Sequence, residues 1–319
     1  MKLIGLMPVR NEDWILGLTA RAALMWCDAL VFFMHACNDG SSSIVQDLRR
    51  EYGDSRIHYL DAIHYHSGAV DATDPTWHEM AHRQALLDAA RSQDATHIVT
   101  IDADELLTGN LLTEIRPMIE GLGPGEILRL PWLATTMNWL EGWAWPGYYV
   151  EGPWAGPLLT MAFKDDPRFH WSAEVRDGYD FHRRHPLVKG GSESYITFNE
   201  PEWAWGEKGG ILHLQFMDGF RLLSKQALYQ MTEVIRWPGR KTPKELAEMY
   251  GAAVYGTIWS KFKKRLCDPE WLQPYQELLG YLKLQANVPF WQFEECQRLW
   301  AEHGPEKFAG LDLFGVVGK

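Results

Sequence analysis

The chain has 319 residues, of which 46% are hydrophobic and 23% are charged, and its formal net charge is −11. This composition is typical of a globular protein with a sizeable core and excludes an intrinsically disordered chain. The length suits one large α/β domain with an appendage, or two modest domains. The four cysteines, Cys27, Cys37, Cys267 and Cys296, are too few and too scattered for a disulfide framework or a cysteine-based zinc site.

The first residues, MKLIGLMPVRNEDW, contain an apolar run that is interrupted at once by Pro8 and Arg10, which is not the pattern of a signal peptide. No run approaches the roughly 20 apolar residues that a spanning helix needs. The sequence therefore predicts a cytoplasmic protein without an integral membrane segment.

The strands and helices expected in the first hundred residues alternate. Apolar runs predict strands at residues 2–7, 29–35, 57–63 and 97–101, with helices at 13–27, 43–53 and 77–93 between them. This alternation predicts a parallel sheet with helices on both faces. Ligands of such sheets bind beyond the carboxyl ends of the strands, where several polar residues of this chain follow the expected strands.

Beyond this alternation the pattern changes. Further strands are expected at 126–134, 158–164 and 211–216, while 165–205 reads as irregular and helices dominate from about residue 218. We expect a catalytic domain over 1–217 and a helical C-terminal region, 218–319, packed on it.

Charge is also uneven along the chain. Residues 221–265 contain ten Lys/Arg and three Asp/Glu, a local excess of +7 on an acidic chain. Such a block indicates contact with an anion, for example a diphosphate, a lipid surface or nucleic acid, or else a solvated helical face.

Asp102-Ala103-Asp104 directly follows the fourth expected strand. Because side chains alternate along an extended backbone, the two carboxylates lie on one side and repel each other unless a positive charge is near. Mg²⁺ and Mn²⁺ prefer such oxygen ligands, and the ion could bridge the phosphates of a nucleotide sugar as a Lewis acid. The alternative is a pair of solvated turn acids, one of which caps a helix.

Four short blocks carry a resemblance: Pro8-Val9-Arg10-Asn11-Glu12, Asn38-Asp39-Gly40-Ser41-Ser42, Arg83-Gln84-Ala85 and Ile101-Asp102-Ala103-Asp104-Glu105. In order and spacing they resemble family 2 glycosyltransferases with the GT-A fold, over about the first 110 residues. The resemblance implies an α/β fold with a Rossmann-like mixed sheet flanked by helices. Gln84 departs from the pattern, since the family often has Asn there.

The same resemblance implies a donor site. Pro8, Val9, Arg10, Asn11 and Asp39 would hold the base and ribose, Arg83 would lie near the nucleotide, and Asp102, Ala103 and Asp104 would reach the ribose and the metal. GT-A enzymes often complete the metal site with a late His or Asp. His213 suits that role because neutral imidazole binds Mn²⁺ well, although a structural histidine is an equal reading of the residues alone.

An inverting transfer needs a general base. The segment 169–177 resembles one in which a carboxylate follows an aromatic strand, so Asp177 is the first candidate and Glu174 the second, with Asp165, Asp166 and Glu151 left open. The loop 138–157 is rich in Trp, Tyr and Gly. Its Trp143, Trp145 and Trp154 are expected to stack on the acceptor.

Together these features predict a metal-dependent hexosyl- or pentosyltransferase, using Mn²⁺ or Mg²⁺ and inverting the sugar. The donor would be a nucleotide-diphosphate sugar, with UDP favoured, and the acceptor a saccharide, lipid-linked or small-molecule hydroxyl. A modified DNA base as acceptor, or a non-catalytic nucleotide-sugar-binding protein, are the alternatives. The P-loop and G-x-S-x-G motifs do not occur, which removes support for an NTPase or a serine hydrolase.

Overall fold

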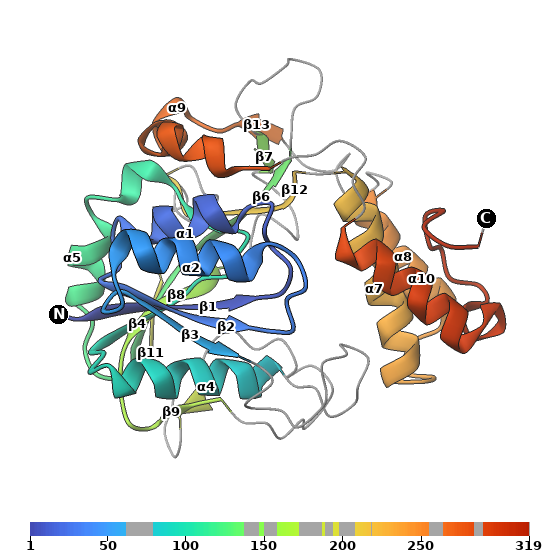
Figure 1. Ribbon diagram of the computed structural model, residues 1–319, viewed down its shortest axis with the longest axis horizontal. Helices are drawn as coiled ribbons and strands as arrows, with labels where there is room; N and C mark the ends of the chain where they lie inside the picture. The colour runs from blue at the N-terminus through green and yellow to red at the C-terminus, as the bar shows by residue number, and fades with distance from the viewer. Residues whose placement is uncertain are drawn as a thin grey trace.

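The computed structural model describes residues 1–61, 79–136, 147–149, 158–171, 187–188, 194–197, 208–217, 219–254, 264–283 and 290–318. The chain begins in an α/β part and ends in a group of helices beside it, at the far side from the N-terminus (Figure 1).

The main sheet is built from strands of three to eleven residues, and a ribbon of two two-residue strands lies outside it. The strands are β1 (Leu3–Val9), β2 (Ala29–Met34), β3 (Ile57–Asp61), β4 (His97–Thr100), β5 (Glu105–Leu107), β6 (Glu126–Thr136), β7 (Gly147–Tyr149), β8 (Leu158–Lys164), β9 (Phe169–His170), β10 (Leu187–Val188), β11 (Ser194–Thr197), β12 (Ile211–Phe216) and β13 (Lys264–Leu266). The helices are α1 (Leu16–Leu24), α2 (Ser41–Tyr52), α4 (Glu79–Ser92), α5 (Ile115–Glu120), α7 (Gly219–Arg236), α8 (Pro243–Val254), α9 (Pro269–Leu272) and α10 (Trp291–His303), with short 3₁₀ turns η1 (Gly109–Leu111), η4 (Gln273–Tyr281) and η5 (Pro305–Phe308).

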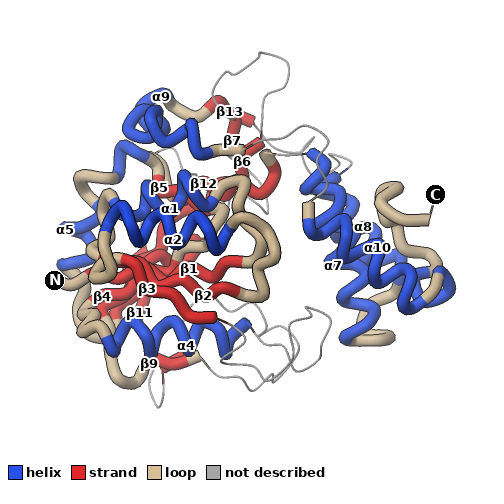
Figure 2. The backbone as a smooth tube through the Cα atoms, in the orientation of Figure 1, coloured by secondary structure: helices blue, strands red, loops and turns tan. Residues whose placement is uncertain are grey.

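The first four strands form the parallel half of the sheet. β1 lies between β2 and β4, β3 lies beyond β2, and all three pairings are parallel. Helices α1 and α2 cover one face of this half and α4 the other (Figure 2). The alternation of strands and helices predicted from the sequence is confirmed, with ends that differ by a few residues.

The other half of the sheet is mixed. β8 pairs antiparallel with both β4 and β6, while β11 and β12 run parallel to β6. The predicted fold class, a mixed α/β sheet flanked by helices, is therefore confirmed. The prediction that residues 165–205 are irregular was wrong for β11, which joins the main sheet, and for the β9–β10 ribbon. Strands of two to four residues are too short to show a hydrophobic period.

β5 was not predicted, and it decides where the candidate site forms. It pairs antiparallel with β12, so that Glu105 lies opposite His213 and Leu107 opposite Ile211. β12 in turn pairs with β6. Through β5, the Asp102–Asp104 turn is thereby connected to β12, a strand that comes much later in the chain.

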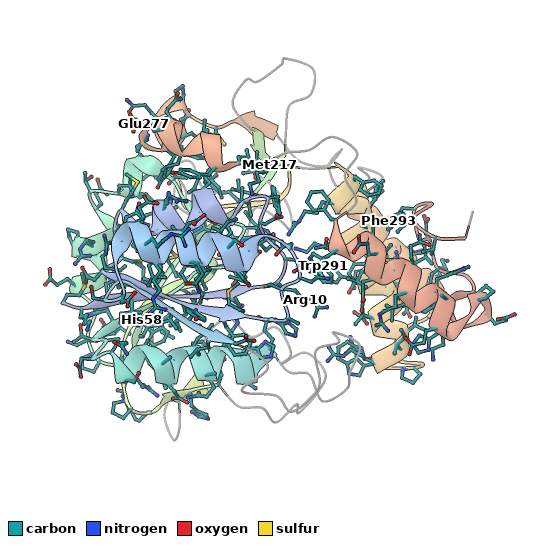
Figure 3. The ribbon with its side chains drawn as sticks, in the orientation of Figure 1. Arg10, His58, Met217, Glu277, Trp291 and Phe293 are labelled. Atoms are coloured by element: carbon teal, nitrogen blue, oxygen red, sulfur yellow. The ribbon has the colours of Figure 1, made fainter. Side chains whose placement is uncertain are left out.

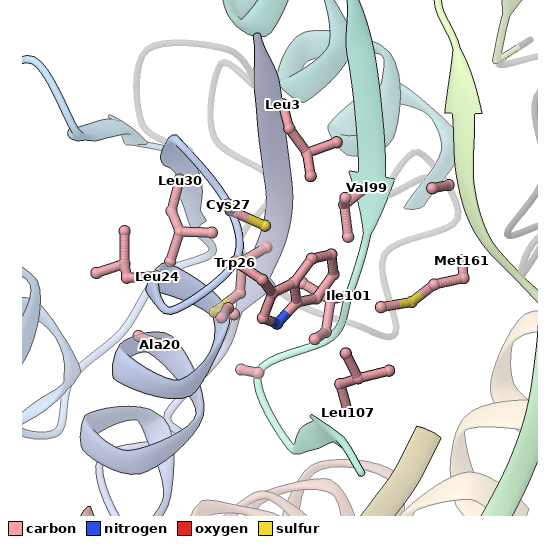
Figure 4. Close-up of a cluster of buried hydrophobic side chains, with 14 of the residues drawn as sticks. Leu3, Ala20, Leu24, Trp26, Cys27, Leu30, Val99, Ile101, Leu107 and Met161 are labelled. Atoms are coloured by element: carbon pink, nitrogen blue, oxygen red, sulfur yellow. The ribbon is translucent and has the colours of Figure 1, made fainter. Parts of the chain in front are cut away.

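Apolar side chains fill both faces of the sheet. On the α1 face a cluster includes Leu3, Trp26, Val99, Ile101 and Met161, all at most 2% exposed (Figure 4). Burial of each such side chain stabilises the fold by about 1.5–3 kcal/mol. A second cluster packs α4 on the opposite face.

The C-terminal helices have a core of their own. Ala227, Met231, Cys296, Leu299 and Phe308 pack together among α7, α10 and η5. Helix α7 begins at Gly219, close to the expected boundary near residue 217, although the division into two domains stays a prediction. None of the helices in the described ranges is long and apolar enough to span a bilayer.

Candidate functional site

The loops that follow β1 and β2 are joined at the carboxyl edge of the sheet. Asn11, with a left-handed φ of 51°, donates its Nδ2 to Asn38 Oδ1 at 2.6 Å and accepts the Asn38 backbone N–H at 2.8 Å. An asparagine tolerates this backbone conformation better than most residues do. The paired amides hold two of the predicted donor-binding segments side by side.

Asp39 anchors the same edge. Its Oδ1 accepts the backbone N–H of Ser41, the first residue of α2, at 2.9 Å, and its Oδ2 accepts that of Asp13 at 3.0 Å. The Asp13 carboxyl also lies against Asp39, and burial together with this neighbouring acid raises the pKa of Asp13. The role of Asp39 toward base and ribose stays a prediction.

Pro8 and Val9 are the last residues of β1, opposite Phe33 and Met34 of β2. Arg10 then leaves the sheet and places its guanidinium 4.5 Å from the ring centre of Trp291, at the start of α10 (Figure 3). Arg10, which the sequence predicts to bind the sugar donor, therefore also links the α/β part to the C-terminal helices.

On one side of the Asp102–Asp104 turn stands Arg83 of α4. Its side chain is 4% exposed, pairs with Glu79 at 2.6 Å and reaches Asp102 Oδ1 at 3.2 Å. The Asp102 side chain is 31% exposed. The structure thus brings together Arg83 and Asp102, two of the residues predicted to bind the sugar donor, and leaves Asp102 partly exposed.

Hydrogen bonds fix the backbone of the turn. The N–H of Asp102 donates to Glu105 Oε2 at 2.9 Å, the carbonyl of Ala103 accepts the Thr19 hydroxyl at 2.7 Å, and the carbonyl of Asp104 accepts the Leu214 N–H at 2.8 Å. Glu105 also accepts the Trp132 indole N–H at 3.2 Å. Glu105 therefore supports the turn instead of facing a ligand.

Asp104 and His213 are brought together from distant parts of the sequence. His213 Nε2 lies 3.3 Å from Asp104 Oδ1, and both side chains are about nine-tenths buried. The Trp132 ring packs 4.4 Å from the imidazole, and Thr135 Oγ1 donates to the His213 carbonyl at 2.9 Å. The proximity expected from the resemblance is present, while the role of the pair as metal ligands stays a prediction.

Three residues of this cluster, Glu12, Arg221 and Lys225, were not identified as site residues from the sequence. Arg221 of α7, only 1% exposed, places Nη2 at 2.7 and 2.9 Å from the two oxygens of Glu12 and at 3.3 Å from Asp104 Oδ2. Lys225, one helical turn later, holds Nζ 3.7 Å from the same Oδ2. The sequence signal for Arg221 and Lys225 was their spacing of four residues inside the basic block, which places both side chains on one face of a helix.

Burial and charge act in opposite directions on the two acids. Burial alone would raise the pKa of Asp104, but His213, Lys225 and Arg221 together hold that pKa well below its usual range. For Glu12, burial dominates and raises the pKa to about 7, although Arg221 and Lys225 oppose the rise. Asp104 is therefore a carboxylate at neutral pH, whereas Glu12 titrates near it.

These residues fit half of a divalent-metal site. Asp104 Oδ1 and His213 Nε2 are an oxygen and a nitrogen donor 3.3 Å apart, which suits adjacent ligands of an ion such as Mn²⁺. In the described ranges no three His, Cys, Asp or Glu side chains gather to hold an ion by themselves, so Asp102 as a third ligand stays a prediction. Mg²⁺ and its analogues are commonly held by one or two protein groups plus substrate phosphates, and this arrangement matches that case.

The remaining predicted residues lie outside the described ranges: the base candidates Asp177, Glu174 and Glu151, and the acceptor candidates Trp143, Trp145 and Trp154. Asp165 and Asp166 are described, and both are paired. Arg91 binds Asp165 at 2.8 and 2.9 Å, and Arg168 binds Asp166 at 2.7 Å, which lowers the pKa of Asp166 to about 2. Such tightly paired acids are poor general bases near neutral pH.

No protein-family model and no curated protein sequence matches the chain. Among solved structures, residues 1–349 of TarS from S. aureus are similar with 12% identity and a TM-score of 0.38, covering 94% of this chain and 83% of that one. The chain spans 54% of the longer TarS structure. Mannosyltransferase PcManGT from Pyrobaculum calidifontis, in complex with GDP-Man and Mn²⁺, is similar with 13% identity and a TM-score of 0.33, covering 95% and 79%.

A mannose-1-phosphate geranyltransferase from Thermus thermophilus is similar with 11% identity and a TM-score of 0.26, covering 83% and 76%. Likeness at this level leaves the donor, the metal and the acceptor to be argued from the residues of the site itself.

Proposed function

We propose that this protein is a metal-dependent glycosyltransferase that transfers a sugar from a nucleotide-diphosphate donor to an acceptor hydroxyl. One observation supports this most: Asp104 and His213 meet at 3.3 Å at the carboxyl edge of the parallel strands, with Arg221 and Lys225 beside them. A carboxylate–imidazole pair next to two cations is an arrangement that can receive a metal ion and a diphosphate together.

The ion, when bound, would supply Lewis-acid stabilisation to the departing diphosphate. Asp104 and His213 would hold it, and the hydrogen bonds to Ala103, Asp104 and Asp102 would keep their turn in place. Such preorganisation matters because groups that are fixed before the reaction need no rearrangement as negative charge develops on the departing diphosphate. Asn11, Asp39 and Arg83 would hold the nucleoside.

The finer assignments remain proposals from the sequence. They are a UDP-sugar as donor, Asp177 as the base that deprotonates the acceptor, with Glu174 second, and the three loop tryptophans as the acceptor platform. Asp177→Asn is expected to reduce transfer while leaving donor binding intact. Full transfer by this variant would remove Asp177 as the base.

Four of the ten Lys and Arg residues of the basic block give no support to nucleic acid as the acceptor. Arg221 and Lys225 face Asp104, and Arg240 and Lys241 both pair with Glu233, at 2.9 and 2.8 Å. These four cations compensate the acids Asp104 and Glu233, whereas a groove that binds a phosphate backbone needs cations that are not paired within the protein.

The test is a thermal-shift panel of nucleotide diphosphates and nucleotide sugars, with and without Mn²⁺, on wild type and Asp104→Ala. A ligand that binds only the folded state raises the melting temperature. We expect one nucleotide family to stabilise the wild type in the presence of Mn²⁺ and not to stabilise Asp104→Ala. Lack of any stabilisation of the wild type would contradict the proposed function.

A non-catalytic nucleotide-sugar-binding protein would pass that panel, so turnover is measured separately. Release of the nucleoside diphosphate from the stabilising donor, in the presence of candidate saccharide acceptors, would establish the enzyme. Asp104→Ala serves as the matched blank in the same assay.

A further inference from the structure

One face of α7 points toward the Asp102–Asp104 turn. Arg221, Lys225 and Tyr229 are spaced by four residues and therefore share this face. The Lys225 ammonium lies 5.9 Å from the centre of the Tyr229 ring. The two cations reach the same oxygen of Asp104, yet they are held very differently.

Arg221 is fixed in place. Besides its contacts to Glu12 and Asp104, its guanidinium lies 4.9 Å from the ring centre of Trp14, and the side chain is 1% exposed. A planar guanidinium with partners at 2.7–2.9 Å cannot turn to a new ligand without breaking these contacts. We assign Arg221 to the permanent structure of the cluster.

Lys225 is held loosely. Its Nζ lies 3.7 Å from Asp104 Oδ2, well beyond the roughly 2.7–2.9 Å of a charge-assisted hydrogen bond. Its side chain is 13% exposed and ends a flexible four-carbon stem. An ammonium in this position can exchange partners at little cost.

The charges of the cluster show what such an exchange would do. Arg221 pairs with both Glu12 and Asp104, and Lys225 lies beside Asp104 alone, so two cations stand next to the Asp104 carboxylate. A divalent ion at Asp104 Oδ1 and His213 would itself balance Asp104 and release the ammonium. The released charge would then meet an incoming polyanion at the same edge of the sheet.

We propose that Lys225 is a diphosphate-binding residue that rests against Asp104 and moves to the phosphate oxygens when the metal and the nucleotide bind. The proposal rests on the proposed function and deepens it, because it makes helix α7 part of the donor site. The ligand recognised is the diphosphate group and not the base or the sugar.

The experiment is isothermal titration calorimetry of the full chain with UDP, UMP, GDP and GMP in the presence of Mn²⁺. We expect Lys225→Gln to weaken the nucleoside diphosphate that the wild type binds by about 10- to 100-fold, and the matching monophosphate by less. Lys225→Arg keeps the charge and is expected to stay within about 5-fold of wild type. Lys244→Gln, on the solvent-facing side of α8 with an 84% exposed side chain, is the matched control and is expected to bind as wild type does.

The outcomes separate the two proposals. A wild type that binds no nucleoside diphosphate, either in this titration or in the thermal-shift panel, would overturn the proposed function itself. A wild type that binds a diphosphate, with Lys225→Gln binding it equally well, would overturn only the role of Lys225. The same conclusion would follow if Lys225→Arg lost as much affinity as Lys225→Gln, because the charge would then not be what binds.

Discussion

The two sides of the Asp102–Asp104 turn differ in what surrounds each carboxylate. On the α4 side, Asp102 is 31% exposed and meets Arg83, whose shorter contact goes to Glu79. On the α7 side, Asp104 is 8% exposed and faces His213, Arg221 and Lys225. Two acids that look equivalent in the sequence thus have different surroundings.

The difference indicates that Asp102 and Asp104 have different roles. A buried carboxylate that cations already compensate is part of the fold, and removing its fixed partner Arg221 leaves charges without compensation. A partly exposed carboxylate with a long contact to its cation costs little to change and is available to a ligand. Stability should therefore depend on the α7 side, and binding on both sides.

Arg221→Met is expected to give the largest loss of stability. It removes the cation that bridges Glu12 and Asp104 while keeping a side chain of similar length. Breaking one partner of a buried ion pair costs about 3–5 kcal/mol. Urea unfolding would measure the loss. Arg298→Met, on the exposed face of α10 where Arg298 pairs with Glu295 and Glu302, is the control and should change stability by less than about 1 kcal/mol. A loss below about 1 kcal/mol for Arg221→Met would show that the cluster does not hold the fold.

The pH dependence of the free energy of unfolding should reveal the raised pKa of Glu12. Burial raises its pKa to about 7 from an ordinary 4.5, so the folded protein binds a proton there that the unfolded chain has already released. The stability linked to this proton is fully present below about pH 4.5 and is lost as the pH rises through about 7. Between pH 5 and pH 8 the unfolding free energy of the wild type, relative to Glu12→Gln, should fall by on the order of 1–3 kcal/mol. Equal pH profiles for the two proteins would mean that Glu12 stays ionised beside Arg221.

Much of the parallel half of the fold was predictable because its strands are continuous apolar runs that end in polar residues. β2, for example, is buried along its whole length and is followed by the Asn38–Asp39 turn. The short strands were not predictable, because β5, with three residues, and β11, with four, are defined by their partners and not by a period of their own. Tertiary pairing overrides local preference in such segments.

The candidate site was predictable on its α4 side and at His213, but not on the rest of the α7 side. Asp102, Arg83 and Asp104 fall in short blocks that resemble a known family. Arg221 and Lys225 lay in a basic block that is equally well explained by a solvated helix face. What sets them apart is the packing of α7 against β12, a long-range contact that no local pattern reports.

Asp102→Asn should have the smallest effect on stability and still a clear effect on binding. The variant keeps the size of the side chain and weakens a partly exposed ion pair, at 3.2 Å from Arg83, so the unfolding free energy should change by less than about 1 kcal/mol. If Asp102 contacts the ribose or the metal, the same variant should lose about 10-fold or more in affinity for the nucleoside diphosphate in the presence of Mn²⁺. Urea unfolding and calorimetric titration on one preparation measure both quantities. A destabilisation as large as that of Arg221→Met would show that the two sides of the turn are not different in kind. Unchanged affinity would leave Asp104, His213 and the cations of α7 as the groups that bind.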